Sequence, residues 1–398
     1  MSALPAAEAR AHLTPVHIDR LTLSDFRNYP NLRLELEPRH VVLSGENGAG
    51  KTNLLEAVSY LVPGRGLRRV DYATVARTGG TGVWGLNARM QGIEGEVSLG
   101  TGIARGPGGE VTRRVQVNGA AARSAEALLE HVRILWLTPA QDGLFTGTAS
   151  DRRRFLDRMV LATDPAHGRR VGEYEKVMRG RNRLLEEGMM NESWLAAQER
   201  QLAELGVAIA LARRELVDVL VHLIATSSDP TSPFPDAALE LDGMLERMFD
   251  RTGASYGAAA DMEDEFRALL ARSRPRDRAA GRTTEGPHRT DLKVRHAPKD
   301  IEAALCSTGE QKALLVGLVL AHARLVGELT TATPILLLDE IAAHLDEGRR
   351  AALFDRVDGL AAQAWMTGTD ASLFAAMDDR AQHLTVCDGA VRLTHAGG

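Results

Sequence analysis

The sequence predicts an α/β fold that is interrupted by an inserted α-helical domain. Residues 17–45 alternate apolar and polar side chains as strands do, and the apolar run "HVVLSG" ends in Gly45. The composition changes at residue 150: residues 150–225 are rich in Ala, Leu, Glu and Arg and almost lack Gly and Pro, which is typical of helices. A pattern typical of alternating helices and strands returns near the end of the chain. We therefore expect three segments, of which the first and third form one head: 1–149, 150–275 and 276–398.

The elements of the segments follow from local pattern. The head is expected to contain a helix over 51–62, Gly-rich hairpins from about 80 to 138, and a further strand in "RILWLTP". In the insertion, one apolar seam follows alternating three- and four-residue spacing and indicates a short antiparallel coiled coil, an arm rather than a core. This seam consists of Leu202, Leu205, Ile209, Ala212, Leu216, Val219 and Leu223.

Composition excludes several classes of protein. The chain has 398 residues, a formal net charge of -5 and 25% charged residues. It therefore lacks the overall positive charge that would indicate binding to nucleic acid. Its two cysteines, Cys306 and Cys387, have no metal-ligand spacing and favour a reducing compartment. The N-terminus lacks the pattern of a secretion signal, and no uninterrupted apolar run reaches the roughly 20 residues of a membrane helix. We expect a cytoplasmic protein with no membrane partner.

A phosphate-binding loop follows the strand that ends at Gly45. "GENGAGKT" fits the P-loop pattern, in which glycines let the backbone wrap an anion closely. Lys51 is expected to reach the β- and γ-phosphates, and the Thr52 hydroxyl to bind Mg²⁺. The predicted nucleotide-binding residues are Gly45, Glu46, Asn47, Gly48, Ala49, Gly50, Lys51 and Thr52.

A second motif, which is acidic, supplies the residues expected to act in catalysis at this site. "PILLLDEIAAHLD", residues 334–346, is an apolar strand that ends in two carboxylates. Asp339 is expected at the metal, usually through water, and Glu340 at the water that attacks the γ-phosphate. Together with the P-loop, this strand predicts a nucleoside triphosphatase that uses Mg²⁺.

The stretch "CSTGEQKALL", residues 306–315, predicts a second anion site. Ser307, Gly309 and the start of the following helix offer donors for a phosphate. A P-loop leaves the γ-phosphate facing outward, so these donors would serve the nucleotide of a second molecule. The stretch resembles the signature loop of ATP-binding-cassette ATPases, in which two heads sandwich two ATP molecules. Thr308 replaces the usual first glycine of that loop, and Glu310 shifts its polar pattern.

Further stretches resemble RecF, the bacterial DNA recombination-mediator ATPase family. They occur in the family's order over most of the chain, from about 17 to 390. "AHLD" after Glu340 also resembles the superfamily's D-loop. In "EGPHRTDL", Thr290 replaces the first of two aspartates that usually follow "GPHR". The stretches are "LTLSDFRNYPNLRLEL" (21–36), "KTNLLEAVSYLVPGRGLR" (51–68), "SDRRRFLDR" (150–158) and "EGPHRTDL" (285–292).

This resemblance implies a fold and a set of site residues. The fold would be an ABC-type P-loop ATPase head, with a mixed central sheet, flanking helices and an antiparallel β subdomain, carrying an inserted helical arm. Asn28 and Tyr29 would lie near the adenine or ribose, and Gln141 would sense the γ-phosphate and Mg²⁺. The switch histidine has no match, and "WMTGTD" offers Thr367 or Thr369 in its place. Because a threonine cannot gather a proton as imidazole does, we expect slow hydrolysis.

The resemblance also implies a role and partners. The chain would bind ATP and DNA, dimerise on ATP, and support RecA loading at gaps in recombinational repair and the SOS response. Its ATPase would be stimulated by DNA, and RecR and RecO would be its mediator partners. Two other functions stay open: a transporter motor subunit, and a non-catalytic nucleotide-dependent scaffold in which Glu340 matters little.

DNA contacts are predicted from clustered arginines. Arg-rich runs are more often solvated faces paired with nearby acids, so each cluster keeps that alternative. Aromatic residues make up only 4% of the chain, which favours salt-sensitive contact with a duplex backbone over base stacking. The first candidates are Arg65, Arg68, Arg69, Arg179, Arg181 and Arg183, and the further ones are Arg152 to Arg154, Arg272, Arg274, Arg276, Arg278 and Arg282.

Overall fold

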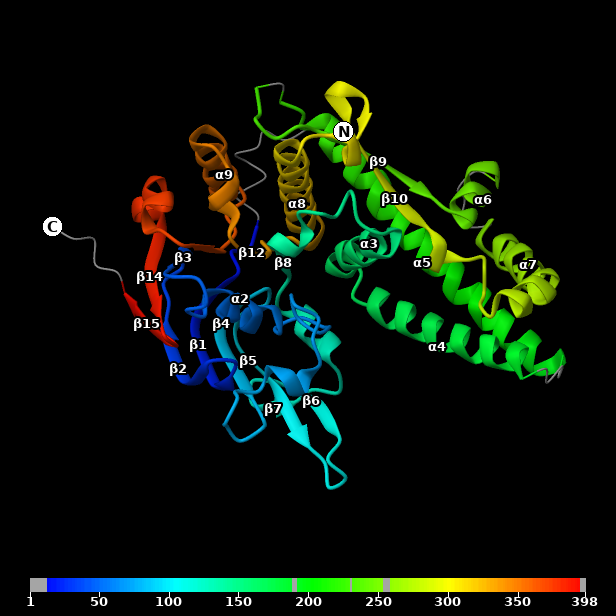
Figure 1. Cartoon of the computed structure of the whole chain (residues 1–398), viewed down its shortest axis with the longest axis horizontal. Coiled ribbons are helices and arrows are strands. Elements are labelled where there is room, and N and C mark those ends of the chain that lie inside the picture. The colour runs from blue at the N-terminus through cyan, green and yellow to red at the C-terminus, as the bar shows by residue number, and fades with distance from the viewer. Residues whose placement is uncertain (1–12, 188–191, 230, 253–257, 394–398) are drawn as a thin grey trace. The chain divides into compact units, whose positions relative to one another are not determined.

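The structure is a computed structural model that describes residues 13–187, 192–229, 231–252 and 258–393 (Figure 1). The chain divides into two compact units. The head unit consists of Met1–Asp142, Asp229–Pro235 and Thr308–Gly398, and the helical unit of Gly143–Ser228 and Asp236–Ser307.

The unit boundaries differ from the segment limits expected from sequence. The chain returns to the head at Thr308 rather than near residue 276. Residues 276–307 stay in the helical unit because they continue its last helix and then supply β10 (Asp291–His296), which pairs with β9 (Ala237–Asp242). The Arg-rich stretch expected to be a connection is thus helical as far as Ala280, despite Pro275.

The head unit is built on a six-stranded mixed sheet in the order β15-β14-β3-β13-β12-β8. Five strands run parallel, and β15 pairs antiparallel with β14. Every residue of β3, β8, β12 and β13 is buried, which explains their continuous apolar sequences. The bounds are β3 His40–Ser44, β8 Ile134–Leu137, β12 Ile335–Leu338, β13 Ala364–Gly368, β14 Ala381–Cys387 and β15 Ala390–Leu393.

A second six-stranded sheet of the head unit is antiparallel and has the order β2-β1-β4-β5-β6-β7. Phe26, Tyr60 and Trp84 form edge-on and tilted ring contacts, with centroids 5.0 to 6.1 Å apart, between this sheet and the end of α2. The mixed central sheet and antiparallel subdomain expected from sequence are both confirmed. The bounds are β1 His17–Phe26, β2 Tyr29–Glu35, β4 Gly85–Gly92, β5 Gly95–Arg105, β6 Val111–Val117 and β7 Ala120–Ala121.

Among its described residues, the head unit contains three α-helices: α2 (Lys51–Ser59), α8 (Thr308–Thr330) and α9 (Glu347–Gly359). Within the described part of the chain, α8 alone is long and apolar enough to meet the criteria for a membrane span. Most of its apolar window, 67%, is buried inside the structure, and α8 packs over β8. Its apolar composition is therefore accounted for by core packing.

The helical unit contains five helices and a three-stranded sheet in the order β11-β10-β9 among its described residues. The helices pack around α5, and their contacts bury Tyr174, Val207 and Phe266 in a core of their own. The helical insertion is confirmed, but the sequence did not predict this sheet. The bounds are α3 Ala149–Thr163, α4 His167–Glu186, α5 Glu192–Thr226, α6 Met244–Thr252, α7 Ala258–Ala280 and β11 Ile301–Glu302.

Helix α5 differs from the narrow seam predicted for it. Val219 of that seam is 43% exposed, whereas Ala203, Val207 and Ala210, which lie off the seam, are buried. The reason is that α5 contacts α4, α7, α3 and β9 rather than one partner helix. The description of this insertion as an arm without a core was wrong.

Candidate nucleotide site

Four neighbouring strands of the parallel sheet end at the same edge, and each is followed by an expected site residue. The P-loop follows β3, Asp339 and Glu340 follow β12, and Gln141 comes soon after β8. Strand β13 lies between β3 and β12 and carries Thr367 near its end. Ser44 is aligned with Gly368, and Leu338 with both Met366 and Leu137, so the strand ends are level. The sheet thus gathers four distant segments at one edge.

The P-loop has a backbone that requires glycine. Gly45, Gly48 and Gly50 have φ angles of 148°, 83° and 117°, which side chains rarely adopt. A Cβ at Gly45 would lie 2.2 Å from the Val386 carbonyl oxygen, and one at Gly50 would lie 2.7 Å from the Tyr29 hydroxyl. Gly45 and Gly50 are therefore required both by dihedral angle and by close packing from β14 and β2, and Gly48 by its dihedral angle alone.

Lys51 lies at the start of α2 with its ammonium folded over the loop. Its Nζ donates to the carbonyl oxygens of Gly45 and Glu46 at 2.6 and 2.8 Å. Burial lowers the pKa of Lys51, whereas the nearby charges of Glu340 and Asp339 act in the opposite direction. A cation bonded only to neutral carbonyls is well suited to bind phosphate oxygens, which are stronger acceptors.

Asp339 is the centre of a hydrogen-bonded cluster. Its Oδ1 accepts from Thr52 Oγ1 at 2.9 Å and from Thr367 Oγ1 at 2.8 Å. The backbone N–H of Glu340 donates to Thr367 Oγ1 at 2.8 Å, and Glu340 has a left-handed φ of 50°. Thr367 is fully buried, whereas Thr369 is exposed. Of the two threonines that are candidates for the position of the switch histidine, only Thr369 presents its side chain to solvent.

The residues present fit a magnesium nucleotide. Among the described residues, no group of three or more His, Cys, Asp or Glu side chains forms a metal cage. Mg²⁺ usually binds through one or two protein oxygens together with substrate phosphates and water. The Thr52 hydroxyl and the Asp339 carboxylate, in contact with each other, supply oxygens of that kind.

Gln141 presents a donor rather than the oxygen expected of a metal ligand. Its Oε1 accepts from the backbone N–H of Thr138 at 3.1 Å, in a capping box that closes the turn Pro139–Gln141. Its Nε2 is buried and has no hydrogen-bond partner among the described residues. In this conformation Gln141 is suited to donate to a phosphate oxygen or a water, and not to ligate Mg²⁺ directly.

Asn28 and Tyr29 support the P-loop. The Tyr29 hydroxyl donates to the Gly50 carbonyl at 3.0 Å, and Asn28 Nδ2 donates to the Ala49 carbonyl at 3.1 Å. Tyr29 is fully buried, and burial raises its pKa. The ring of Tyr29 has no exposed face with which to stack on a base, and the expectation that Asn28 and Tyr29 lie near the adenine or ribose stays a prediction. Sequence analysis placed these residues near the site but missed their bracing contacts.

The part of the signature stretch that belongs to the head unit, from Thr308 onward, lies on the β8 side of this sheet. Helix α8 begins at Thr308, one residue after Ser307, and Lys312 in its second turn pairs with Asp142 at 3.4 Å. Asp142 follows the turn after β8, and β8 is three strands away from β3, or roughly 14 Å at ordinary strand spacing. The first turns of α8 are therefore distant from the P-loop of the same chain.

The D-loop stretch is described in part. Asp346 caps α9 by accepting from the backbone N–H of Arg349 at 2.8 Å, and Arg349 Nη1 reaches the Gly309 carbonyl at 3.5 Å. The side chains of Ala343 and His344 lie outside the described residues. Within one head, the segment after Glu340 thus contacts the start of the signature helix.

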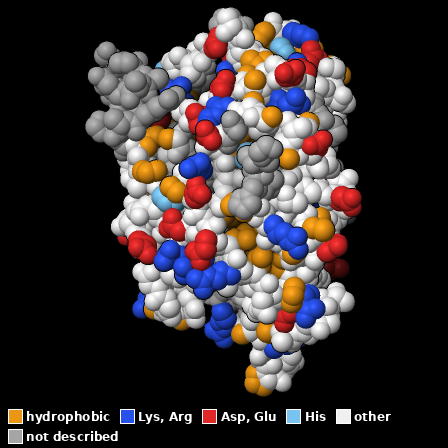
Figure 2. Space-filling model, turned by 90° about the vertical axis from the view of Figure 1, so that its left-hand side faces the viewer, with side chains coloured by type: hydrophobic (Ala, Val, Ile, Leu, Met, Phe, Trp, Pro, Cys, Tyr) orange, Lys and Arg blue, Asp and Glu red, His pale blue; other side chains and the backbone are white. Residues whose placement is uncertain are grey.

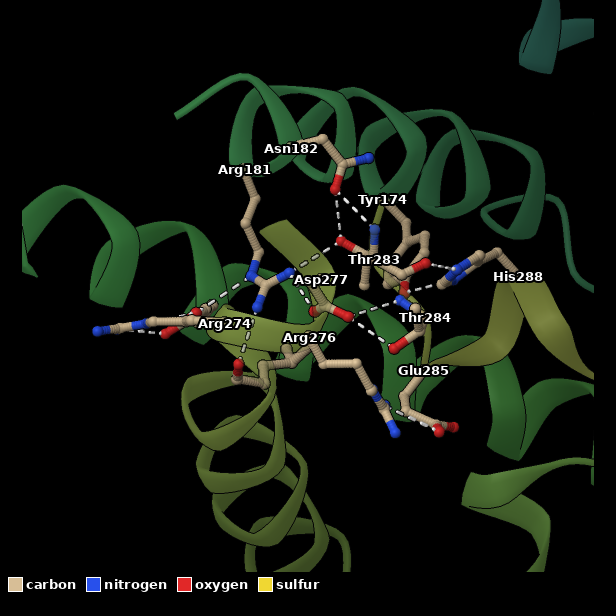
Figure 3. Close-up of polar contacts among 12 residues, drawn as sticks. Tyr174, Arg181, Asn182, Arg274, Arg276, Asp277, Thr283, Thr284, Glu285 and His288 are labelled. Atoms are coloured by element: carbon tan, nitrogen blue, oxygen red, sulfur yellow. Dashed lines mark hydrogen bonds and ion pairs between the residues drawn. The ribbon is translucent and has the colours of Figure 1, made fainter. Parts of the chain in front are cut away.

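Arg181 was wrongly included among the DNA candidates. Its side chain is fully buried in the helical unit, and Figure 3 shows it enclosed by acidic and hydroxyl side chains. It donates to Glu199, Asp277 and Thr283 and to the Leu270 carbonyl, at 2.8 to 3.1 Å. A guanidinium with no exposed surface and four internal acceptors cannot bind phosphate.

Several other candidate arginines serve internal contacts. Arg68 pairs at 2.5 Å with Glu56, a fully buried carboxylate. Arg274 makes a bidentate contact with Glu199 at 2.6 and 2.9 Å (Figure 3). In "SDRRRFLDR", Arg152 binds both oxygens of Asp291, Arg153 donates to the Thr290 carbonyl and Arg154 pairs with Asp151. The mixture of packing and ion pairs weighed for that motif is confirmed.

The remaining candidates are on the surface. Arg65, Arg179 and Arg183 are exposed and pair with acidic residues four to six positions away. Arg272, Arg276, Arg278 and Arg282 are also exposed, and of these only Arg276 forms an ion pair with another described residue. Arg69 has an interaction partner of its own. On the one face that Figure 2 draws, basic and acidic side chains are interspersed.

The fold and this cluster of residues define the head of a P-loop nucleoside triphosphatase. The RecF/RecN/SMC N terminal domain family matches residues 17–391. The DNA replication and repair protein RecF of Rhizobium leguminosarum bv. trifolii (strain WSM2304) is 59% identical over 377 residues, which cover 94% of this chain and 98% of that protein. RecF of Mesorhizobium japonicum is 61% identical over 375 residues, covering 94% and 97%. The chain therefore belongs to the RecF family.

A solved structure agrees with this fold. The chain superposes with a TM-score of 0.83 on a structure of the recombination mediator protein RecF-ATPrS in the RecFOR pathway. The match covers 96% of this chain and 100% of that one at 21% identity, so it supports the fold alone. The ABC/SMC-like ATPase head expected from sequence is confirmed, and membership in the RecF family excludes the alternative of a transporter motor.

Proposed function

We propose that this chain is an ATP-hydrolysing DNA replication and repair protein that is active as an ATP-dependent homodimer. The observation that carries the proposal is the set of three strand ends that brings the P-loop, Asp339, Glu340 and Gln141 to one edge of the sheet. The names of relatives at 59 and 61% identity support the biological role. ATP is the nucleotide named with two similar structures.

The residues of the nucleotide site have separate roles in ATP hydrolysis. The glycine-shaped loop and Lys51 bind the phosphates, while Thr52 and Asp339 hold Mg²⁺, which neutralises charge on the phosphate oxygens when bound. Glu340 orients and polarises the attacking water, and the Gln141 amide donates to the γ-phosphate side. Thr369 is the exposed candidate for the position of the switch histidine, and we propose that its lack of basicity keeps turnover slow. We also propose that DNA binding stimulates this turnover.

The site is complete only in a dimer. Strand β8 lies roughly 14 Å from β3 at ordinary strand spacing, because three strand intervals separate them, and α8 pairs through Lys312 with Asp142 on the β8 side. Ser307 and Gly309 therefore serve the γ-phosphate bound by a second copy. In this arrangement ATP joins two heads, and hydrolysis releases them.

The DNA-contacting surface follows the exposed side of α4 and the end of α7. Arg169, Lys176, Arg179 and Arg183 are spaced by seven, three and four residues, so they share one helix face. Arg272, Arg278 and Arg282 add positive charge without acidic partners among the described residues. Such side chains bind the phosphate backbone without reading sequence, so affinity should fall steeply with salt. RecR- and RecO-type mediators would recognise the same DNA-bound dimer and help it support RecA loading at gaps.

Light scattering after size-exclusion chromatography tests the central claim. Wild-type protein with Mg-ATP and gapped duplex should double in mass, and Ser307→Arg should abolish that doubling without loss of ATP binding by the single head. Glu340→Gln should give a dimer that persists on DNA and fails in repair. Equal masses under all conditions contradict the composite site, and normal repair by Glu340→Gln would favour a non-catalytic scaffold.

A further inference from the structure

We propose that Thr367 is a positioning residue for ATP hydrolysis: its hydroxyl holds the Asp339 side chain and the Glu340 backbone in fixed relation. The inference rests on the proposed ATPase function, and it goes beyond it by assigning a task to a side chain that touches neither substrate nor metal.

The hydroxyl of Thr367 both donates and accepts in this contact. It donates to Asp339 Oδ1 at 2.8 Å and accepts from the Glu340 N–H at 2.8 Å. Thr367 has no solvent exposure, and all five residues of β13 are buried. Since water cannot replace either partner there, the two bonds are fixed by the fold.

The Glu340 N–H needs this acceptor because the strand pairing has already ended. The β12–β13 register stops at Leu338 opposite Met366, and Glu340 then adopts a φ of 50°. A left-handed conformation is unfavourable for a residue with a side chain, so it persists where the surroundings enforce it. The peptide orientation at Glu340 sets the direction in which its carboxylate leaves the strand. Thr367 therefore helps to aim the proposed general base.

The same hydroxyl orients the carboxylate on the metal side. Asp339 Oδ1 accepts from two hydroxyls, and they differ in origin: Thr52 lies on the P-loop helix, and Thr367 on the strand between β3 and β12. The bond from Thr367 comes from the rigid sheet, so it keeps Asp339 in place while the P-loop side binds its ligand. One buried hydroxyl thus couples Asp339 to Glu340.

A set of four substitutions tests the role. Thr367→Val keeps the shape and removes the hydroxyl, and Thr367→Ser keeps the hydroxyl and removes the methyl group. Thr333→Val is the matched control, because Thr333 is 1% exposed and its hydroxyl accepts from the backbone N–H of Val16 at 3.0 Å, away from the site. Thr367→Ala takes the place of the Val variant if the latter does not fold.

The first readout needs no nucleotide. Amide hydrogen exchange at Glu340 should be at least about tenfold faster in Thr367→Val than in wild type, since a buried acceptor is lost. Exchange at Glu340 should be unchanged in Thr367→Ser and Thr333→Val. Unchanged exchange in Thr367→Val would overturn the proposed hold on Glu340, whether or not the chain hydrolyses ATP.

The second readout is a split between binding and turnover. Thr367→Val should lower kcat by up to ~10²-fold, the order expected for a small misplacement of reacting groups, with ATP affinity within about threefold of wild type. Thr367→Ser should restore most of kcat. Wild-type kcat in Thr367→Val, or equal loss in the Ser variant, would overturn the proposal. No turnover in the wild type would instead refute the ATPase function on which it rests.

Discussion

The buried guanidinium of Arg181 offers a sharp test of how the helical unit is stabilised. In Arg181→Leu, an apolar side chain would replace a group that makes four polar contacts with no exposed surface. Glu199 would keep its bidentate contact with Arg274, and Asp277 would keep its bonds from Thr284. Asp277 would nevertheless lose its ion-pair partner while remaining buried.

The magnitude follows from that uncompensated charge. Removing one member of a buried ion pair costs about 3–5 kcal/mol. We expect a cost in this range for Arg181→Leu, because Glu199 stays paired whereas Asp277 does not. The matched control is Arg183→Leu on the same helix. Arg183 is 79% exposed, and among the described residues its ion-pair partner is Glu187 on the surface, so its loss should cost less than ~1 kcal/mol.

Urea denaturation of the full chain, followed by circular dichroism and by protease cleavage within 143–307, measures both variants. Two probes are needed because a two-unit protein need not unfold in one step. Arg181→Leu should unfold its helical unit at lower urea than Arg183→Leu does. A cost for Arg181→Leu no larger than that of the control would refute the view that the network in Figure 3 stabilises this unit.

Three further predictions concern the P-loop and the loop at His288. Gly50→Ala should abolish ATP binding, measured by titration calorimetry, because its Cβ would lie 2.5 Å from Asn28 Nδ2. Tyr29→Phe should cost about 1 kcal/mol in thermal unfolding and weaken ATP binding several-fold, because the Gly50 carbonyl loses a donor. Burial lowers the pKa of His288 to about 4, below its ordinary 6.5. As the pH falls, His288 is therefore protonated in the unfolded state before it is protonated in the folded state. Stability should therefore be full above pH 6.5 and fall as the pH drops toward 4, with a shallower fall in His288→Gln.

The nucleotide-site motifs were predictable because their geometry is encoded locally. The glycines of "GENGAGKT" are required by the backbone dihedrals of one continuous loop, and the two acids follow one apolar strand. The contacts of Tyr29 with Gly50 and of Thr367 with Asp339 were not predictable in this way. They depend on which strands become neighbours, and residues 21 and 28 positions apart meet only after the sheets form.

The arginines show a similar limit. Arg181 and Arg183 are identical in type and two positions apart, yet one is fully buried and the other is 79% exposed. Helical phase distinguishes them, since Arg181 follows the buried Tyr174 and Val177 at the spacing of the apolar face. The position of Arg181 on the apolar face of the helix could therefore have been recognised from the sequence, but the prediction considered only its charge. An arginine at an apolar position is better interpreted as part of a buried network than as a phosphate contact.

The proposed composite site makes a prediction that distinguishes it from a self-sufficient head. Ser307→Arg damages the γ-phosphate side that a chain offers to its partner, whereas Glu340→Gln damages the site on its own P-loop. In a mixed dimer, the Glu340 of one chain would face the Ser307 of the other, so one of two sites would be intact. Equal mixing of the inactive variants should then restore activity up to about a quarter of the wild-type level, the value reached when the chains pair at random, half the dimers are mixed and each mixed dimer has one good site. If each head hydrolysed ATP alone, mixing would add nothing to the mean of the two separate variants, and that result would contradict the two-chain site.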